Sequence, residues 1–206
     1  MTTTRALISA MQVTLDGYIL GPDAESDWVD SWSDALELLP PVDTFVLGGG
    51  MFPGYGQFWT TVLDDPGAAA DMLGRELYPS ETSYAKFAAE TPHLVVSSTL
   101  TESDTSWPTT SIVGIDEVRA LKSQPGKAVY VVGGPTLMTS LLHEGVLDEL
   151  RLIVHPVAVG SGTALFEPIT ERQELDLVAA RAGAAGRVIL TYRPVSAGAG
   201  PRPVGD

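Results

Sequence analysis

An α/β architecture is indicated most clearly by residues 127–136, which read Lys127-Ala128-Val129-Tyr130-Val131-Val132-Gly133-Gly134-Pro135-Thr136. The apolar, largely β-branched run predicts a buried strand, and the amphipathic segment that follows at 137–142 predicts a helix. Glycine lets the backbone approach a ligand closely, and proline suits the first helical turn. The free N–H groups and dipole of a helix N-terminus favour an anion. The pattern therefore predicts an anion site without specifying the anion.

The composition predicts one globular domain. A chain of 206 residues, 44% hydrophobic and 18% charged, is long enough to bury one substantial core. No apolar run approaches the roughly 20 residues of a membrane span, and no secretory pattern follows Arg5. Since the chain has no cysteine, a disulfide framework, a thiolate metal site and a cysteine nucleophile are excluded. We expect a cytoplasmic enzyme.

The net charge argues against two classes of partner. The chain has 26 acidic and 12 basic residues, a formal charge of −14. Such a surface lacks the Lys/Arg patch that neutralises phosphate groups, so we expect neither a nucleic-acid nor a membrane partner. The acidity is otherwise explained by solubility. A phosphate-binding pocket in this chain has to supply its own local field.

Periodicity predicts alternating strands and helices, then a hairpin. Strands are predicted at 6–15, 44–47, 93–97, 129–132 and 147–157, with a loop at 18–23. Helices are predicted at 26–39 and 52–62, and a further helix ends with residues 86–90. Another helix is predicted from its cap Asp116 to residue 123, and the last begins at 135. Residues 64–84, polar and containing Pro and Gly, are expected to form an insertion or lid loop. An antiparallel hairpin at 174–193 and a disordered tail at 194–206 follow. We expect a single domain over 1–193 with a mixed sheet.

Several segments, taken in order, resemble one family. They are Leu15-Asp16-Gly17-Tyr18-Ile19, Val95-Val96-Ser97-Ser98-Thr99-Leu100, Val131-Val132-Gly133-Gly134, Val146 to Leu152 with His155-Pro156-Val157, Val159-Gly160-Ser161-Gly162, and Leu165-Phe166. Their order and spacing resemble the C-terminal reductase domain of RibD, the bacterial bifunctional riboflavin-biosynthesis protein. The resemblance covers about residues 5–193.

The resemblance implies a dihydrofolate reductase-like fold of three layers, with a central mixed, mainly parallel sheet and an antiparallel C-terminal hairpin. It implies NADPH in an extended cleft, donating hydride to a small planar heteroaromatic or carbonyl substrate. By the same resemblance the pyrophosphate would be cradled by Gly133, Gly134, Pro135 and Thr136, the adenosine end would lie along Ser97, Ser98 and Thr99, and the loop over the nicotinamide would comprise Asp16, Gly17, Tyr18 and Ile19. With the apolar strand at 147–157, it also implies a homodimer.

The sequence departs from the family pattern after the second predicted strand. There the family commonly has Gly-Arg, then Thr and an aromatic residue, and the arginine and threonine bind cofactor phosphates. This chain has Gly48-Gly49-Gly50-Met51-Phe52-Pro53, and Ser98 replaces a second basic residue. Because a charge-assisted hydrogen bond contributes about 1.5–3 kcal/mol, losing two would weaken NADPH by a few orders of magnitude.

This departure leaves several alternatives open. One alternative is that another basic residue replaces the missing phosphate-binding arginines. A second is that the protein uses NADH or a flavin. A third alternative is a cofactor-independent enzyme or a small-molecule-binding protein on the same fold. Gly48, Gly49, Gly50 and Met51 stay candidates for cofactor contact through the backbone, with an ordinary turn as the alternative.

Aromatic residues suggest a pocket for a flat substrate. The candidate substrate-binding residues are Trp28, Phe52, Tyr55, Gln57 and Trp59, although aromatic residues at helical spacing also suit a core. The candidate catalytic residues are Tyr55 and Asp27. Asp27 would donate a proton if burial raises its pKa; the alternative is an ordinary carboxylate at a helix N-terminus.

The sequence offers no metal site and no hydrolytic triad. His93, His143 and His155 are scattered, with no i, i+4 pair, and no Ser-His-Asp order or nucleophile elbow is present. This pattern suits chemistry in which a bound cofactor supplies the reactivity and the protein supplies orientation.

Overall fold

The computed structural model describes residues 5–101, 104–105, 107 and 109–195. Its strands are β1 (Leu7–Thr14), β2 (Tyr18–Leu20), β3 (Val42–Gly48), β4 (His93–Val96), β5 (Thr110–Val113), β6 (Ala128–Gly133), β7 (Glu149–His155), β8 (Thr163–Ala164), β9 (Leu175–Ala182) and β10 (Val188–Pro194). Its helices are η1 (Trp32–Leu38), α1 (Phe52–Asp64), α2 (Pro66–Leu73), α3 (Pro79–Glu90), α4 (Ile115–Ala120), η3 (Leu121–Ser123), α5 (Pro135–His143) and η4 (Ala184–Gly186). None of these helices is long and apolar enough to cross a membrane.

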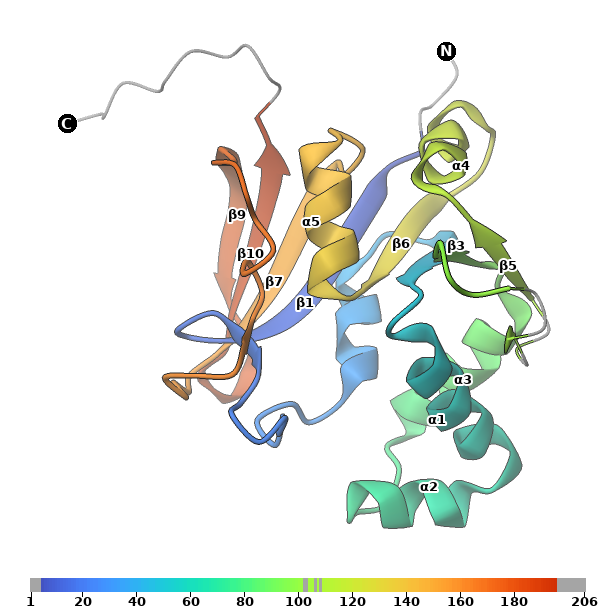
Figure 1. Ribbon diagram of the computed structural model, residues 1–206. Helices are drawn as coiled ribbons and strands as arrows, with labels where there is room; N and C mark the ends of the chain where they lie inside the picture. The colour runs from blue at the N-terminus through green and yellow to red at the C-terminus, as the bar shows by residue number, and fades with distance from the viewer. Residues whose placement is uncertain (1–4, 102–103, 106, 108, 196–206) are drawn as a thin grey trace.

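An eight-stranded sheet forms the centre of the molecule, in the order β5-β4-β3-β6-β1-β7-β10-β9 (Figure 1). Every pair from β5 to β7 is parallel, whereas β10 is antiparallel to both β7 and β9. Parallel neighbours need crossover connections, which the helices provide. The predicted mixed, mainly parallel sheet with an antiparallel C-terminal hairpin is confirmed.

Helices cover both faces of the sheet, which gives three layers (Figure 1). Successive strand residues point to opposite faces. Val46 therefore packs in the core beneath α4 and α5, whereas its neighbours Phe45 and Leu47 pack beneath η1 and α1–α3. Burial on both faces explains why β1 is buried along its whole length.

Most of segment 64–84 lies in α2 and α3, which corrects the predicted loop. Asp65 caps α2 by accepting a hydrogen bond from the Ala68 N–H at 3.0 Å, and Gly74 ends it with φ of +64°. Pro79 then begins α3. The prolines and glycines mark helix ends here, because proline fits a first helical turn and glycine fits a left-handed terminal residue. Both helices pack against α1, with Tyr84 buried between layers.

Two other local predictions are also corrected. Residues 26–39 are not one helix: turns precede the short 3-10 helix η1, whose N-cap is Ser31. The predicted loop at 18–23 begins with β2, which pairs antiparallel with β8. The backbones of the segments around Leu20 and Gly162 approach closely, since a Cβ at Gly162 would lie 2.1 Å from the Leu20 carbonyl oxygen.

The remaining boundaries differ by a few residues. The helix after β5 begins beyond Gly114, so Asp116 lies inside its first turn rather than at the cap. β7 begins at Glu149 rather than Leu147. The sheet runs to Pro194, the end of β10, while residues 196–206 of the predicted tail lie outside the described part of the chain.

Candidate functional site

A cavity of about 1050 Å³ lies at the carboxyl ends of β3, β4, β5 and β6. Ligands of open α/β sheets bind at this edge, and the volume suits a small molecule or a cofactor. The polar side chains on its wall are Gln12, Tyr55, Tyr84, Ser97, Ser98, Thr99, Tyr130, Thr136, Ser140 and Thr163. No charged residue occurs among the described residues that line it.

At three of the four turns at this edge, some backbone N–H groups already donate hydrogen bonds within the protein. After β4, the Ser97 hydroxyl accepts from the N–H groups two and three residues later, at 3.1 and 3.0 Å. After β5, the Glu117 carboxylate accepts from the Gly114 N–H at 3.1 Å. After β3, the Gly49 N–H donates to the Val96 carbonyl at 2.9 Å. These groups are committed to holding the turns.

The turn after β3 opens α1 without a capping side chain, and the turn after β6 likewise opens helix α5. Gly134 is the N-cap, with φ of +90°, and Pro135 follows at the first helical position. A Cβ at Gly134 would meet nothing within 4 Å, so the backbone is open to the cavity here. The first-turn N–H groups of a helix lack intrahelical partners, and the dipole adds positive potential. This end of the cavity is therefore suited to one anion.

Aromatic rings of α1 and α3 form the opposite wall. The ring centroids of Trp59 and Tyr84 lie 4.4 Å apart, and those of Tyr55 and Trp59 lie 6.3 Å apart. The Tyr55 hydroxyl lies 3.0 Å from that of Tyr84 and 3.1 Å from Nε2 of the buried His93. These rings, inclined to one another by 41° and 66°, give a largely apolar aromatic surface.

The hydrogen bonds of this wall have a fixed direction. His93 Nδ1 lies 2.7 Å from the Thr91 carbonyl oxygen, so Nδ1 carries the proton. Burial lowers the pKa of His93 to about 4, so its Nε2 is an acceptor at neutral pH. Tyr55 therefore donates to His93, and Tyr84 donates to Tyr55. Burial raises the pKa of both tyrosines, so the wall stays neutral.

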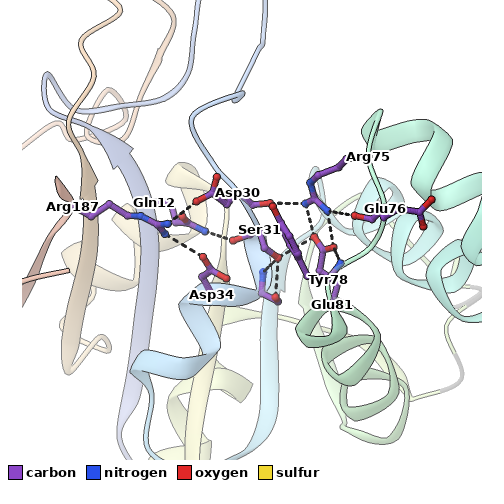
Figure 2. Close-up of polar contacts among 10 residues, drawn as sticks. Gln12, Asp30, Ser31, Asp34, Arg75, Glu76, Tyr78, Glu81 and Arg187 are labelled. Carbon is purple, nitrogen blue, oxygen red and sulfur yellow. Dashed lines mark hydrogen bonds and ion pairs between the residues drawn. The ribbon is translucent and has the colours of Figure 1, made fainter. Parts of the chain in front are cut away.

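Trp32 and Ala35 of η1 also line the cavity, and a polar cluster fixes the segment that carries them (Figure 2). We define the 30–34 cluster as Asp30, Ser31, Asp34, Arg75, Glu81 and Arg187. Arg75 donates to both oxygens of Glu81 at 2.8 and 2.9 Å and to the Asp30 carbonyl. The Ser31 hydroxyl donates to the buried Glu81 at 3.0 Å.

From the other side, Arg187, which directly precedes β10, and Gln12 of β1 hold the same segment (Figure 2). Arg187 pairs with Asp30 at 2.6 Å and with Asp34 at 3.2 Å. Gln12 donates to the Ser31 carbonyl at 2.7 Å, and its own oxygen accepts from His155 Nε2 at 2.9 Å. These long-range hydrogen bonds and ion pairs stabilise the turns before η1 in place of the helix predicted at 26–39. Their partners lie far apart in the sequence, so a local pattern could not indicate them.

Asp16 holds the loop beside β2 rather than facing the cavity. Its carboxylate accepts from the Thr14 hydroxyl at 2.6 Å and from the backbone N–H groups of Gly160 and Val159 at 2.8 and 3.1 Å. The hydrogen bonds to Thr14 and Gly160 lower the pKa of Asp16. The carboxylate thereby fixes the turn that leads into β8.

The structure brings most of the predicted cofactor residues together. The cavity lining includes Ile19, Gly48, Gly49, Gly50, Met51, Ser97, Ser98, Thr99, Gly133, Gly134, Pro135 and Thr136, together with the predicted substrate residues Tyr55 and Trp59. Asp16, Gly17, Tyr18, Asp27, Trp28, Phe52 and Gln57 are not among the lining residues.

Physical reasons separate that second group from the cavity. Asp27 is exposed on a turn, and Gln57 is exposed on α1. Phe52 is buried in the core. Trp28 lines a separate cavity of about 210 Å³ with His155 and Arg187. Asp27 is not at a helix N-terminus, because the helix predicted there is absent.

The polar lining residues that sequence reasoning missed include Gln12 and Tyr84, whereas the hypothesis of an aromatic pocket had included Trp32. Gln12 could have been noticed as an amide side chain in a mostly apolar predicted strand. Tyr84 was hidden by the mistaken loop at 64–84. The described residues contain no group of three or more His, Asp or Glu side chains able to hold a metal ion.

Several solved structures with a similar fold are reductases or riboflavin-biosynthesis proteins by name. A putative riboflavin biosynthesis protein from Shewanella sp. PV-4 has a TM-score of 0.65 and 20% identity, covering 92% of this chain and 99% of that one. Dihydrofolate reductase from Enterococcus faecalis, complexed with NADP(H), has a TM-score of 0.52 and 13% identity, covering 92% and 96%. The protein has the dihydrofolate reductase-like fold.

Sequence comparison gives the family. Residues 5–189 match the model of the RibD C-terminal domain. An uncharacterized protein of Bacillus subtilis (strain 168), YyaP, is 32% identical over 190 residues, which are 91% of this chain and 94% of YyaP. The chain belongs to the RibD C-terminal domain family.

Proposed function

We propose that the protein is an NAD(P)H-dependent reductase that transfers hydride to a small planar heteroaromatic or carbonyl substrate. The observation that carries this proposal is the division of one cavity into two ends. One end is the uncapped N-terminus of α5, suited to the diphosphate of a dinucleotide, and the other is an aromatic wall suited to flat rings. Membership of the RibD C-terminal domain family supports the same reaction class.

The residues present fit a nicotinamide dinucleotide through the backbone. Gly133, Gly134 and the first turn of α5 would hold the diphosphate, and the hydroxyls of Ser98 and Thr99 suit ribose or adenine. A reduced nicotinamide would supply the hydride. The aromatic wall would hold the rings face to face and exclude water.

The wall also assigns roles to its two tyrosines. Because Tyr84 donates to Tyr55, and Tyr55 donates to His93, the Tyr84 oxygen keeps acceptor capacity toward a ligand. We propose that Tyr55 positions Tyr84. Catalytic proton donation by Tyr55 or Asp27 stays a prediction.

Binding of the dinucleotide can be followed by the fluorescence of Trp32 and Trp59, which line the cavity. We expect saturable quenching by a reduced nicotinamide dinucleotide. Gly134→Ala should weaken binding by about tenfold, because a methyl group would stand where the diphosphate approaches the backbone. Gly145→Ala is the matched control, since Gly145 also has positive φ and open space but lies off the cavity. No binding of NADH or NADPH at millimolar concentration would contradict the proposal.

We also propose a homodimer. The edge strand β9 and its neighbour β10 expose Leu177, Val178 and Val188, with 54%, 46% and 41% of each side chain accessible. A second copy would cover this apolar edge. Sedimentation velocity at micromolar concentration should show a dimer, and a monomer alone would contradict this.

A further inference from the structure

We propose that the cavity selects NADH over NADPH, because its described lining carries no cation to pair with the additional phosphate. This inference rests on the proposed function. The two cofactors differ only by a 2′-phosphate, and such a phosphate monoester carries about 1.5–2 negative charges at neutral pH. Transferring it from water into a cavity costs free energy unless charged or hydrogen-bonding partners replace the lost hydration.

The described cations do not lie on the cavity wall. Most are held in ion pairs elsewhere: Arg5 with Asp43, Arg75 with Glu81, Arg119 with Asp116 and Glu144, Lys122 with Asp148, Arg151 and Arg193 with Glu149, Arg172 with Glu174, and Arg187 with Asp30 and Asp34. Lys86, Lys127 and Arg181 are also absent from the lining. Among the described residues, no basic side chain therefore replaces the arginines that the family pattern leads one to expect.

Several backbone N–H groups at the other turns already have partners within the protein. The N–H groups after Ser97 are taken by its hydroxyl, and the Gly114 N–H is taken by Glu117. Glu117 also brings a carboxylate to the rim at Gly114, which accepts hydrogen bonds from ribose hydroxyls but repels phosphate. The N-terminus of α5 remains for the diphosphate that both cofactors share. The formal charge of −14 offers no long-range attraction for the extra phosphate.

Isothermal titration of the wild-type protein with NADH and with NADPH, at low salt, measures this selectivity directly. We expect NADPH to bind at least about tenfold more weakly.

Gly50→Arg should remove most of the preference. Gly50 lines the cavity, is exposed, and a Cβ there would meet nothing within 4 Å. A guanidinium at this turn should raise the affinity for NADPH relative to that for NADH by about tenfold. Gly54→Arg is the matched control, because Gly54 is equally open and exposed but lies off the lining on α1. It changes the net charge identically and should leave the ratio of the two affinities unchanged.

The outcomes separate this inference from the function beneath it. Equal or tighter binding of NADPH by the wild-type protein overturns the selectivity while the reductase proposal stands. An equal shift in Gly50→Arg and Gly54→Arg would also overturn it, since the cause would then be net charge. If the wild type binds neither cofactor, the proposed function itself fails.

Discussion

The cavity and the 30–34 cluster lie side by side but use charge in opposite ways. The cluster joins Asp30, Asp34 and Glu81 to two arginines, whereas the described lining of the cavity carries no charged side chain. The chain has few cations, and this region uses Arg75 and Arg187 to fix the segment that bears Trp32. Ion pairs therefore hold in place the segment that carries Trp32, whereas backbone groups and aromatic rings form the binding surface of the cavity.

The largest expected effect is on the cluster. Glu81→Gln should lower the free energy of unfolding by about 3 kcal/mol, because Glu81 is buried and its carboxylate holds Arg75, Ser31 and the start of α3. Urea denaturation measures this loss. Glu76→Gln, an exposed neighbour with the same charge change, should stay within about 0.5 kcal/mol of wild type. Equal stability of both variants would show that the cluster does not hold the segment.

A second prediction separates the neutral wall from the charged cluster by pH. The pKa of His93 is about 4 in the folded protein and 6.5 when unfolded, so the unfolded chain binds more protons between these values. Stability should therefore fall as the pH drops from 6.5 toward 4, by about 3 kcal/mol at most. Glu81, whose pKa is lowered in the fold, loses its contribution as the pH falls from the ordinary carboxyl value of 4.5 through its lower folded value.

Urea denaturation at a series of pH values tests this difference. His93→Gln should flatten the decline between pH 6.5 and about 4.5. His155→Gln should flatten it only in part, because the pKa of His155 is also lowered by burial and by Arg187. A wild-type protein whose stability does not change over this window would contradict the neutral, buried state of His93.

The smallest effect is expected at the exposed side of the cluster. Arg187→Gln should cost about 1 kcal/mol or less, since Asp30 is more than half exposed, and the loss should shrink at 1 M salt, where the Debye length is about 3 Å. Arg172→Gln breaks a fully surface pair with Glu174 and serves as the control. Thermal melts at low and high salt compare the two. A salt-independent loss in Arg187→Gln would point to packing instead of charge.

Local sequence signals predicted the sheet and one end of the site. The strand, glycines and proline of 128–136 form a self-contained unit, so the turn at Gly133 and Gly134 could be placed from sequence. The ends of α2 and α3 could not be placed from sequence, because proline and glycine occur both in loops and at helix ends.

The rest of the site depends on contacts between distant residues. The bonds of Ser31 to Gln12 and Glu81 join three elements, and they override the helical spacing of 26–39. The chain from Tyr84 to Tyr55 to His93 likewise joins α3, α1 and β4. Periodicity within one segment cannot reveal such partners.

The most direct test of the central claim is a crystal of the protein soaked with NADH. The account predicts that electron density for the diphosphate lies against the backbone of 133–136, with the nicotinamide ring beside Trp59 and Tyr84. A diphosphate bound away from the N-terminus of α5, or a cavity without dinucleotide after soaking at millimolar concentration, would contradict it.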